Sequence, residues 1–137
     1  MTALTFDSYS EARGHFKDVL DAAEGGRPVL IRRDSVQAAV VDAERLRYAL
    51  ARLCRRAEVV SEAGGWSVFV PGLPVAADGA SFDEALDEMV DALRDYAEDW
   101  SDRLRDAPNH RDNWGLIQLV ALSDDNQLKE WIAGSTP

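Results

Sequence analysis

The sequence has few of the residues that build metal, redox or covalent catalytic sites. Its 137 residues include one cysteine and two histidines. A single cysteine, Cys54, excludes an internal disulfide and agrees with a reducing compartment; we expect it to be a buried structural thiol. His15 and His110 have no partner at zinc-ligand spacing, and neither a catalytic triad pattern nor a glycine-rich phosphate loop is present. We therefore expect no catalysis, no metal and no cofactor.

Long apolar runs are also absent. None approaches the roughly 20 residues that a membrane-spanning helix needs. The first six residues lack the basic start and apolar centre of a secretion signal. The hydrophobic content of 46% and the charged content of 29% are typical of a globular protein. These features predict a cytoplasmic protein without membrane contact, long enough for one ordinary domain or two small ones.

Basic residues are scarce in the second part of the chain. Residues 1–57 have a formal net charge of +2, whereas residues 58–137 have −12. The first part can approach phosphate, and the second would be repelled by it but suits a basic partner, such as an RNA-binding protein. The alternative is that the acidic residues only keep the protein soluble.

The first part predicts the order strand, helix, strand, strand, helix. A short strand at 2–6 precedes a capping box at Ser8–Glu11, and Gly25-Gly26 ends the helix that follows. Strands at 28–31 and 38–41 flank a turn, and Asp42 can cap the next helix. The predicted apolar positions are Ala12, Phe16, Val19, Leu20 and Ala23 on the first helix, and Leu46, Ala49, Leu50 and Leu53 on the second.

The second part predicts strands at 58–62 and 66–70 around a Gly64-Gly65 turn, and a brief third strand at 75–77. A capping box at Ser81–Glu84 opens an amphipathic helix that extends to Trp100 and has an acidic outer face. Residues 101–113 form a polar connection. We expect the chain after Gly134 to fray, and the four tryptophans to lie in the core: Trp66, Trp100, Trp114 and Trp131.

Periodicity does not decide the structure of Leu116–Leu122, which is either a strand or a buried helical turn. We favour a strand because the segment is short. The following Ser123-Asp124-Asp125 has the composition of a helix cap, and the last helix would carry Leu128, Trp131 and Ile132.

Two motifs in the first part carry a family resemblance. Ser10-Glu11-Ala12-Arg13, followed by Pro28–Arg33 and a second apolar strand, resembles the DNA-binding and dimerisation half of Phd/YefM antitoxins. The resemblance implies that a dimer contacts operator DNA through Arg13 and Arg33. Arg32 is an additional charge, and Lys17 is a plausible phosphate contact. We expect Arg13 in the first turn of its helix, beside free backbone amides that attract phosphate.

Two observations stand against a simple transfer of that resemblance. The hairpin turn, Asp34-Ser35-Val36, lacks the glycine common in the family. The toxin-wrapping tail usual in the family is replaced here by a longer acidic segment. The alternative for Arg13, Arg32 and Arg33 is a solvated basic face without a ligand.

The second part is similar to HicB-type antitoxin domains. The similarity rests on Gly65-Trp66 at the start of a strand, Pro71-Gly72-Leu73-Pro74, Gly79 and the capped helix from Ser81. It implies a partial ribonuclease-H-like βββαβ domain, with Leu116–Leu122 as the last strand. Asp83 and Asp87 lie on the polar face of the helix, and the strands carry too few carboxylates for a two-metal nuclease site.

Together, these features predict an α+β protein. A βαββα Phd/YefM-like module at 1–56 would precede a HicB-like domain at 57–137 with a short C-terminal helix. The implied function is a non-catalytic bacterial antitoxin. It would neutralise a cognate toxin, a small ribonuclease, and repress its own operon by binding operator DNA as a homodimer or higher even oligomer. The alternatives are a transcription regulator whose second half binds a small ligand or a non-toxin protein, and a degenerate nuclease.

Overall fold

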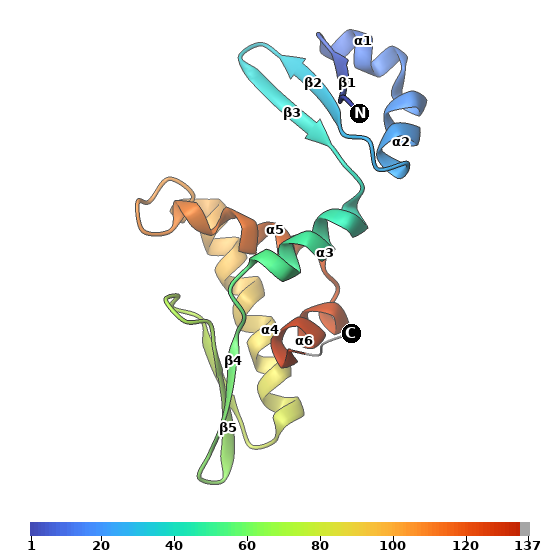
Figure 1. The fold of residues 1–137 in the computed structure, drawn as a ribbon. Helices are drawn as coiled ribbons and strands as arrows, with labels where there is room; N and C mark the ends of the chain where they lie inside the picture. Colours follow the sequence, from blue (N-terminus) through green and yellow to red (C-terminus); the bar gives the residue numbers. More distant parts are fainter. Residues whose placement is uncertain (135–137) are drawn as a thin grey trace. The chain divides into compact units, whose positions relative to one another are not determined.

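The computed structural model describes residues 1–134, and the chain forms two compact units, Met1–Tyr48 and the remainder from Ala49 (Figure 1). Each unit combines a three-stranded sheet with helices, so the predicted α+β class is confirmed. No helix among the described residues has both the length and the apolar character needed to cross a membrane. Our prediction for the chain after Gly134 concerns residues that lie outside those described.

The first unit is a small sheet with two helices on one face. It contains β1 (Leu4–Phe6), α1 (Tyr9–Gly14), α2 (Phe16–Glu24), β2 (Val29–Arg33) and β3 (Val36–Val40). β1 is parallel to β2, and β2 is antiparallel to β3. Ser8 caps α1 as predicted, because its Oγ accepts a hydrogen bond from the Glu11 amide at 3.1 Å. The buried core of this unit is small: Phe6, Ala12, Val19 and Val29.

The single helix predicted after Ser8 is instead two helices that meet at His15. His15 has φ −124° and ψ 31°, which is outside the helical region. The break resets the helical period, so Val19 and Ala23 are buried while Phe16 and Leu20 are 51% and 53% exposed. The prediction that Phe16 and Leu20 face the core is therefore wrong.

Helix α3 (Ala43–Leu53) spans the boundary between the units. Asp42 accepts a hydrogen bond from the Arg45 amide at 2.8 Å, as a helix cap does. The predicted apolar stripe is only partly correct, since no α3 residue is fully buried and Leu53 is 81% exposed. Leu50, Ala51 and the following Cys54 pack against the core of the second unit.

The second unit places one long helix across an antiparallel sheet. The strands β4 (Glu58–Glu62), β5 (Gly65–Phe69) and β6 (Ala76–Gly79) pair in chain order. Helix α4 (Phe82–Asp99) packs on β5 and β6, and Ser81 caps it by accepting from the Glu84 amide at 3.1 Å. The predicted hairpin and capped helix are thus confirmed. The buried side chains of α4 are Ala85, Leu86, Met89, Val90, Leu93 and Tyr96.

Leu116–Leu122 is not a strand. It belongs to α5 (Trp114–Leu122), and its buried residues Leu116, Ile117, Leu119 and Val120 follow the spacing of one helical face. That face packs against α4 in the core of the second unit. The apolar run of the segment is compatible with either a helix or a strand, so the sequence pattern did not distinguish them. The last strand of the expected βββαβ order is therefore absent from the described residues, and helices follow α4 instead.

The final helix, α6 (Asp125–Ala133), was predicted correctly. Asp124 and Gln127 form a reciprocal capping box, and Leu128, Trp131 and Ile132 are buried. Helices α5 and α6 both pack against α4.

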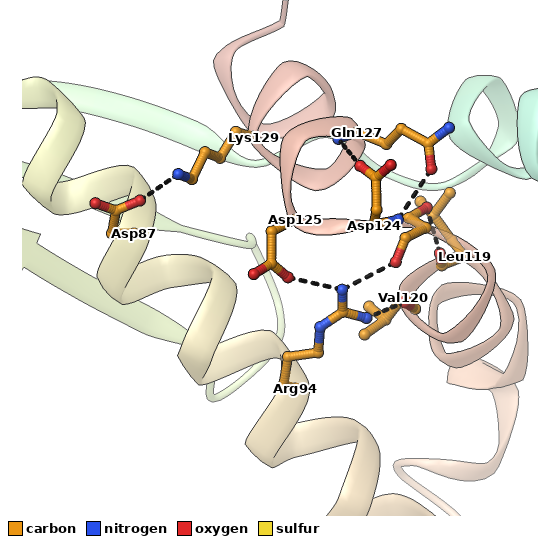
Figure 2. Close-up of polar contacts among 9 residues, drawn as sticks. Asp87, Arg94, Leu119, Val120, Asp124, Asp125, Gln127 and Lys129 are labelled. Atoms are coloured by element: carbon orange, nitrogen blue, oxygen red, sulfur yellow. Dashed lines mark hydrogen bonds and ion pairs between the residues drawn. The ribbon is translucent and has the colours of Figure 1, made fainter.

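The guanidinium of Arg94 fastens α4 to the corner between α5 and α6 (Figure 2). It donates to the carbonyl oxygens of Val120 and Ser123 and to Asp125 Oδ1, the last two at 2.9 Å. The Val120 carbonyl lies in the last turn of α5 and the Ser123 carbonyl follows it, where no helical amide is left to pair with them. A second link, between Lys129 of α6 and Asp87 of α4, joins the same helices.

The polar connection after α4 is structured rather than open. It contains a π-helical turn (Trp100–Leu104) and a 3₁₀ turn (Arg111–Asn113). The indole nitrogen of Trp100 donates to the carbonyl of His110 at 2.8 Å, and Tyr96 Oη lies 2.8 Å from His110 Nδ1. These contacts tie the connection back to the end of α4.

The tryptophans follow the prediction except at one position. Trp100 and Trp131 are buried and Trp66 packs against the core, whereas Trp114 is 53% exposed. Trp114 is the first residue of α5, where the helix leaves the connection.

Candidate nucleic-acid interface

The two adjacent arginines of β2 lie on opposite faces of the first sheet. Arg33 pairs with Val36 and shares the face of Val29 and Ile31, which α1 and α2 cover. Arg32 pairs with Gln37 and lies on the other face. Because side chains alternate along a strand, this separation could have been predicted from the sequence. The two side chains therefore leave the strand on opposite faces.

A groove of about 410 Å³ opens beside Arg33 at the tip of the β2–β3 hairpin. Asp34 makes the turn with φ 54°, a left-handed conformation that aspartate tolerates better than most residues. This conformation explains how the turn closes without the glycine common in the resembling family. The groove is lined by Tyr9, Ile31, Arg33, Asp34, Ser35, Val36 and Ala38.

Arg13 lies four residues after Tyr9, so the two side chains share one face of α1. Contrary to our prediction, Arg13 is in the last turn of its helix and not the first, because the break at His15 ends α1 after six residues. Arg13 therefore does not lie beside the free amides at the start of α1. A cation is instead favoured there by the helix dipole.

Arg13, Arg32 and Arg33 are exposed, and none of their guanidinium groups forms a hydrogen bond or ion pair with another residue of the described part of the chain. Lys17 differs from them. Its ammonium group lies 2.7 Å from Asp21 Oδ2, one turn along α2, and this hydrogen bond together with the carboxylate charge raises the pKa of Lys17. The pair is exposed and weak, so a phosphate can replace the carboxylate.

Arg33 thus lines the Tyr9 groove, Arg13 lies one helical turn from Tyr9 on the same face of α1, and Arg32 lies on the other face of the sheet. Arginine presents a planar set of donors that matches a phosphate or the edge of a guanine. An unpaired guanidinium group in an open groove, with a second one a helical turn beyond Tyr9, is chemically suited to bind a polyanion.

The first unit exposes large apolar side chains that the sequence pattern did not predict. Apart from the terminal Met1, between 39% and 63% of each is exposed. β3 adds an uncharged, exposed edge strand, Val-Gln-Ala-Ala-Val, and the absence of charge was the available signal. Such a surface is typical of a protein interface. The side chains are Tyr9, Phe16, Leu20, Val36, Val41 and Tyr48.

The second unit presents carboxylates instead of arginines. The exposed face of α4 is a continuous acidic row, in which Asp87 is paired with Lys129. Among residues 1–134, no three His, Cys, Asp or Glu side chains are grouped as metal ligands would be. The acidic row consists of Asp83, Glu84, Asp87, Glu88, Asp91, Asp95 and Glu98.

Comparison with known proteins gives one family match and one similar structure. The model of a PHD-like family, described as "Antitoxin of toxin-antitoxin, RelE / RelB, TA system", matches residues 1–134. No curated relative matches the chain. A crystal structure described as the antitoxin part of a toxin/antitoxin system from Syntrophomonas wolfei subsp. wolfei aligns with a TM-score of 0.73 and 21% identity over 96% of each chain. At this identity the similarity shows a shared fold.

Proposed function

Since this chain belongs to that family of antitoxins of toxin–antitoxin systems, we propose that it binds operator DNA and a cognate toxin with different units. In this proposal residues 1–56 are a Phd/YefM-like module that binds DNA as a homodimer and represses the protein's own operon. Residues 57–137 are the toxin-binding domain, related to HicB proteins in its βββα part. The protein itself is not catalytic, and its toxin partner is a small basic ribonuclease.

The observation that carries the DNA proposal is the pair of unpaired arginines, Arg33 in the Tyr9 groove and Arg13 one helical turn after Tyr9. An arginine held in an internal ion pair would have to break it before binding DNA, whereas these two are available. Lys17 supplies a further phosphate contact when a DNA phosphate replaces Asp21 as the partner of its ammonium group. Arg32, on the opposite face of the sheet, makes a separate and weaker contribution.

Dimerisation is supported by what the first unit exposes. A unit of 48 residues with four side chains in its core cluster buries little apolar surface, and small domains of this kind are marginally stable alone. The exposed edge of β3 and the exposed apolar side chains provide the surface that a second copy would cover. A two-fold dimer doubles the number of DNA contacts and matches a palindromic operator.

The toxin proposal is supported by charge. With a net charge of −12 over residues 58–137, this part is unsuited to bind nucleic acid and suited to bind a protein that itself binds RNA. Covering such a protein's basic surface would compete with its RNA substrate.

A gel-shift titration on the DNA upstream of the gene tests the DNA proposal. The double variant Arg13→Ala/Arg33→Ala should abolish the shift, because each guanidinium is worth about 1–3 kcal/mol and a dimer loses four of them. Arg103→Ala/Arg105→Ala removes the same charge from exposed side chains of the second unit and should leave binding unchanged. Light scattering should show the same oligomer for all three proteins.

An unchanged shift in the Arg13/Arg33 variant would contradict the assignment of those residues. The absence of any shift by the wild-type protein at low salt would overturn operator binding altogether.

A further inference from the structure

The sheet of the second unit has two chemically different faces. Val59, Trp66, Val68 and Ala77 point to the side of α4 and belong to or pack against the buried core. The residues that alternate with them form the opposite side, here called the outer sheet face. By strand pairing it consists of the rows Glu58–Phe69–Ala76, Val60–Ser67–Asp78 and Glu62–Gly65.

The outer sheet face combines apolar side chains with charge of one sign. Val60 is 38% exposed and Phe69 is half-buried, although neither belongs to the core cluster. Three carboxylates, on Glu58, Glu62 and Asp78, lie around them, and the rows contain no basic residue. Apolar contacts at the centre with charged groups at the rim are the usual anatomy of a protein interface.

One end of this face is hollow. A shallow cavity of about 380 Å³ is lined by Glu62 and Asp78, with Gly65 and Ser67 among the residues between them. Gly65 has no side chain to fill the space. Ser67 Oγ donates to Asp78 Oδ1 at 2.6 Å and so fixes the direction of that carboxylate. Two carboxylates flanking an open hollow are suited to one guanidinium or ammonium group.

The acidic row of α4 is the competing surface, and it lacks these features. Its exposed side chains are all charged, and one of them, Asp87, is already paired with Lys129. A row of carboxylates without apolar neighbours is explained by solubility alone. The outer sheet face has apolar side chains and a hollow beside its carboxylates, and these are features of a binding surface.

We infer that the outer sheet face is the docking surface for the basic toxin, with an arginine or lysine of that protein inserted between Glu62 and Asp78. This inference rests on the proposed function, since it names where the toxin of that proposal binds. Nucleic acid is disfavoured as the occupant, because three carboxylates on one face repel phosphate.

The test compares two charge reversals of equal size in the full-length protein. Glu62→Lys/Asp78→Lys changes the outer sheet face, and Asp91→Lys/Glu98→Lys changes two exposed α4 carboxylates. The probe is the protein encoded by the adjacent gene, and calorimetry gives its Kd. We expect the sheet variant to raise Kd by about tenfold to a hundredfold, and the α4 variant by less than about threefold. Circular dichroism verifies folding, and Glu62→Lys alone replaces the double variant if that unfolds.

The outcomes distinguish the two proposals. A larger loss of affinity in the α4 variant, or equal losses in both, would overturn the outer sheet face as the docking surface and leave the antitoxin function intact. Failure of the wild-type protein to bind the adjacent gene product would contradict the toxin part of the proposed function, and the inference would fall with it.

Discussion

Removing Arg94 should destabilise the second unit, because its guanidinium joins three helices. The guanidinium holds two carbonyl oxygens at the end of α5 and one carboxylate of α6, all from a position on α4 (Figure 2). In Arg94→Ala the two carbonyls lose their donors. A hydrogen bond to a charged group contributes about 1.5–3 kcal/mol when it is fully buried.

The expected loss is smaller than twice that value, because 35% of the Arg94 side chain is exposed and water can replace part of what it donates. We expect Arg94→Ala to lower the free energy of unfolding by about 2–3 kcal/mol. Asp125→Ala removes only the ion pair, and its carboxylate is 68% exposed, so the expected cost is about 0–1 kcal/mol. Arg94→Lys keeps the positive charge but lacks the planar guanidinium, so its loss of unfolding free energy should lie between those of Arg94→Ala and Asp125→Ala.

Urea denaturation followed by tryptophan fluorescence is a suitable assay, because all four tryptophans lie in the second unit. With a urea dependence of about 1–3 kcal/mol/M, the Arg94→Ala midpoint should fall by roughly 0.7–3 M. The reasoning would be refuted by a change below about 0.5 kcal/mol, which is within the range of ordinary surface substitutions. It would equally fail if Asp125→Ala cost as much as Arg94→Ala.

Two further predictions concern packing and a thiol. A Cβ at Gly79 would lie 2.4 Å from the Ala85 amide nitrogen. Gly79→Ala should therefore displace α4 and lower the free energy of unfolding by about 1–3 kcal/mol in the same assay. The control is Gly115→Ala, whose Cβ would meet nothing closer than 3.8 Å and which should be neutral. Burial raises the pKa of Cys54, so less thiolate is present at a given pH, and iodoacetamide should alkylate the native protein more slowly than the urea-unfolded chain. Equal alkylation rates, measured by mass spectrometry, would show that Cys54 is not protected. The folded state holds this thiol proton more tightly, so its stabilising contribution is lost as pH rises above the usual thiol pKa.

Features that depend on residues close together in the chain were predicted more accurately than features that depend on tertiary packing. Ser8 and Ser81 cap their helices as predicted, without the predicted return bond from the glutamate to the cap amide, and the α6 cap lies at Asp124 within the predicted Ser123-Asp124-Asp125. These signals are local, because a cap needs only residues three positions apart. The β4–β5 hairpin and the buried face of α4 were likewise fixed by alternation and by helical spacing. For the candidate site, the residue types were predicted from the sequence, but the separation of Arg32 from Arg33 was missed although the strand period implies it.

By itself, the sequence determined the α+β class, the capped helices and the opposite charges of its two parts, because each depends on residues near one another in the chain. Only the tertiary structure decided that Leu116–Leu122 is helical, because an apolar segment of seven residues satisfies either state until α4 gives it a partner. The helix break at His15 likewise depends on tertiary packing. Packing against the sheet, and not helix propensity, buries Val19 and Ala23 and leaves Phe16 and Leu20 exposed.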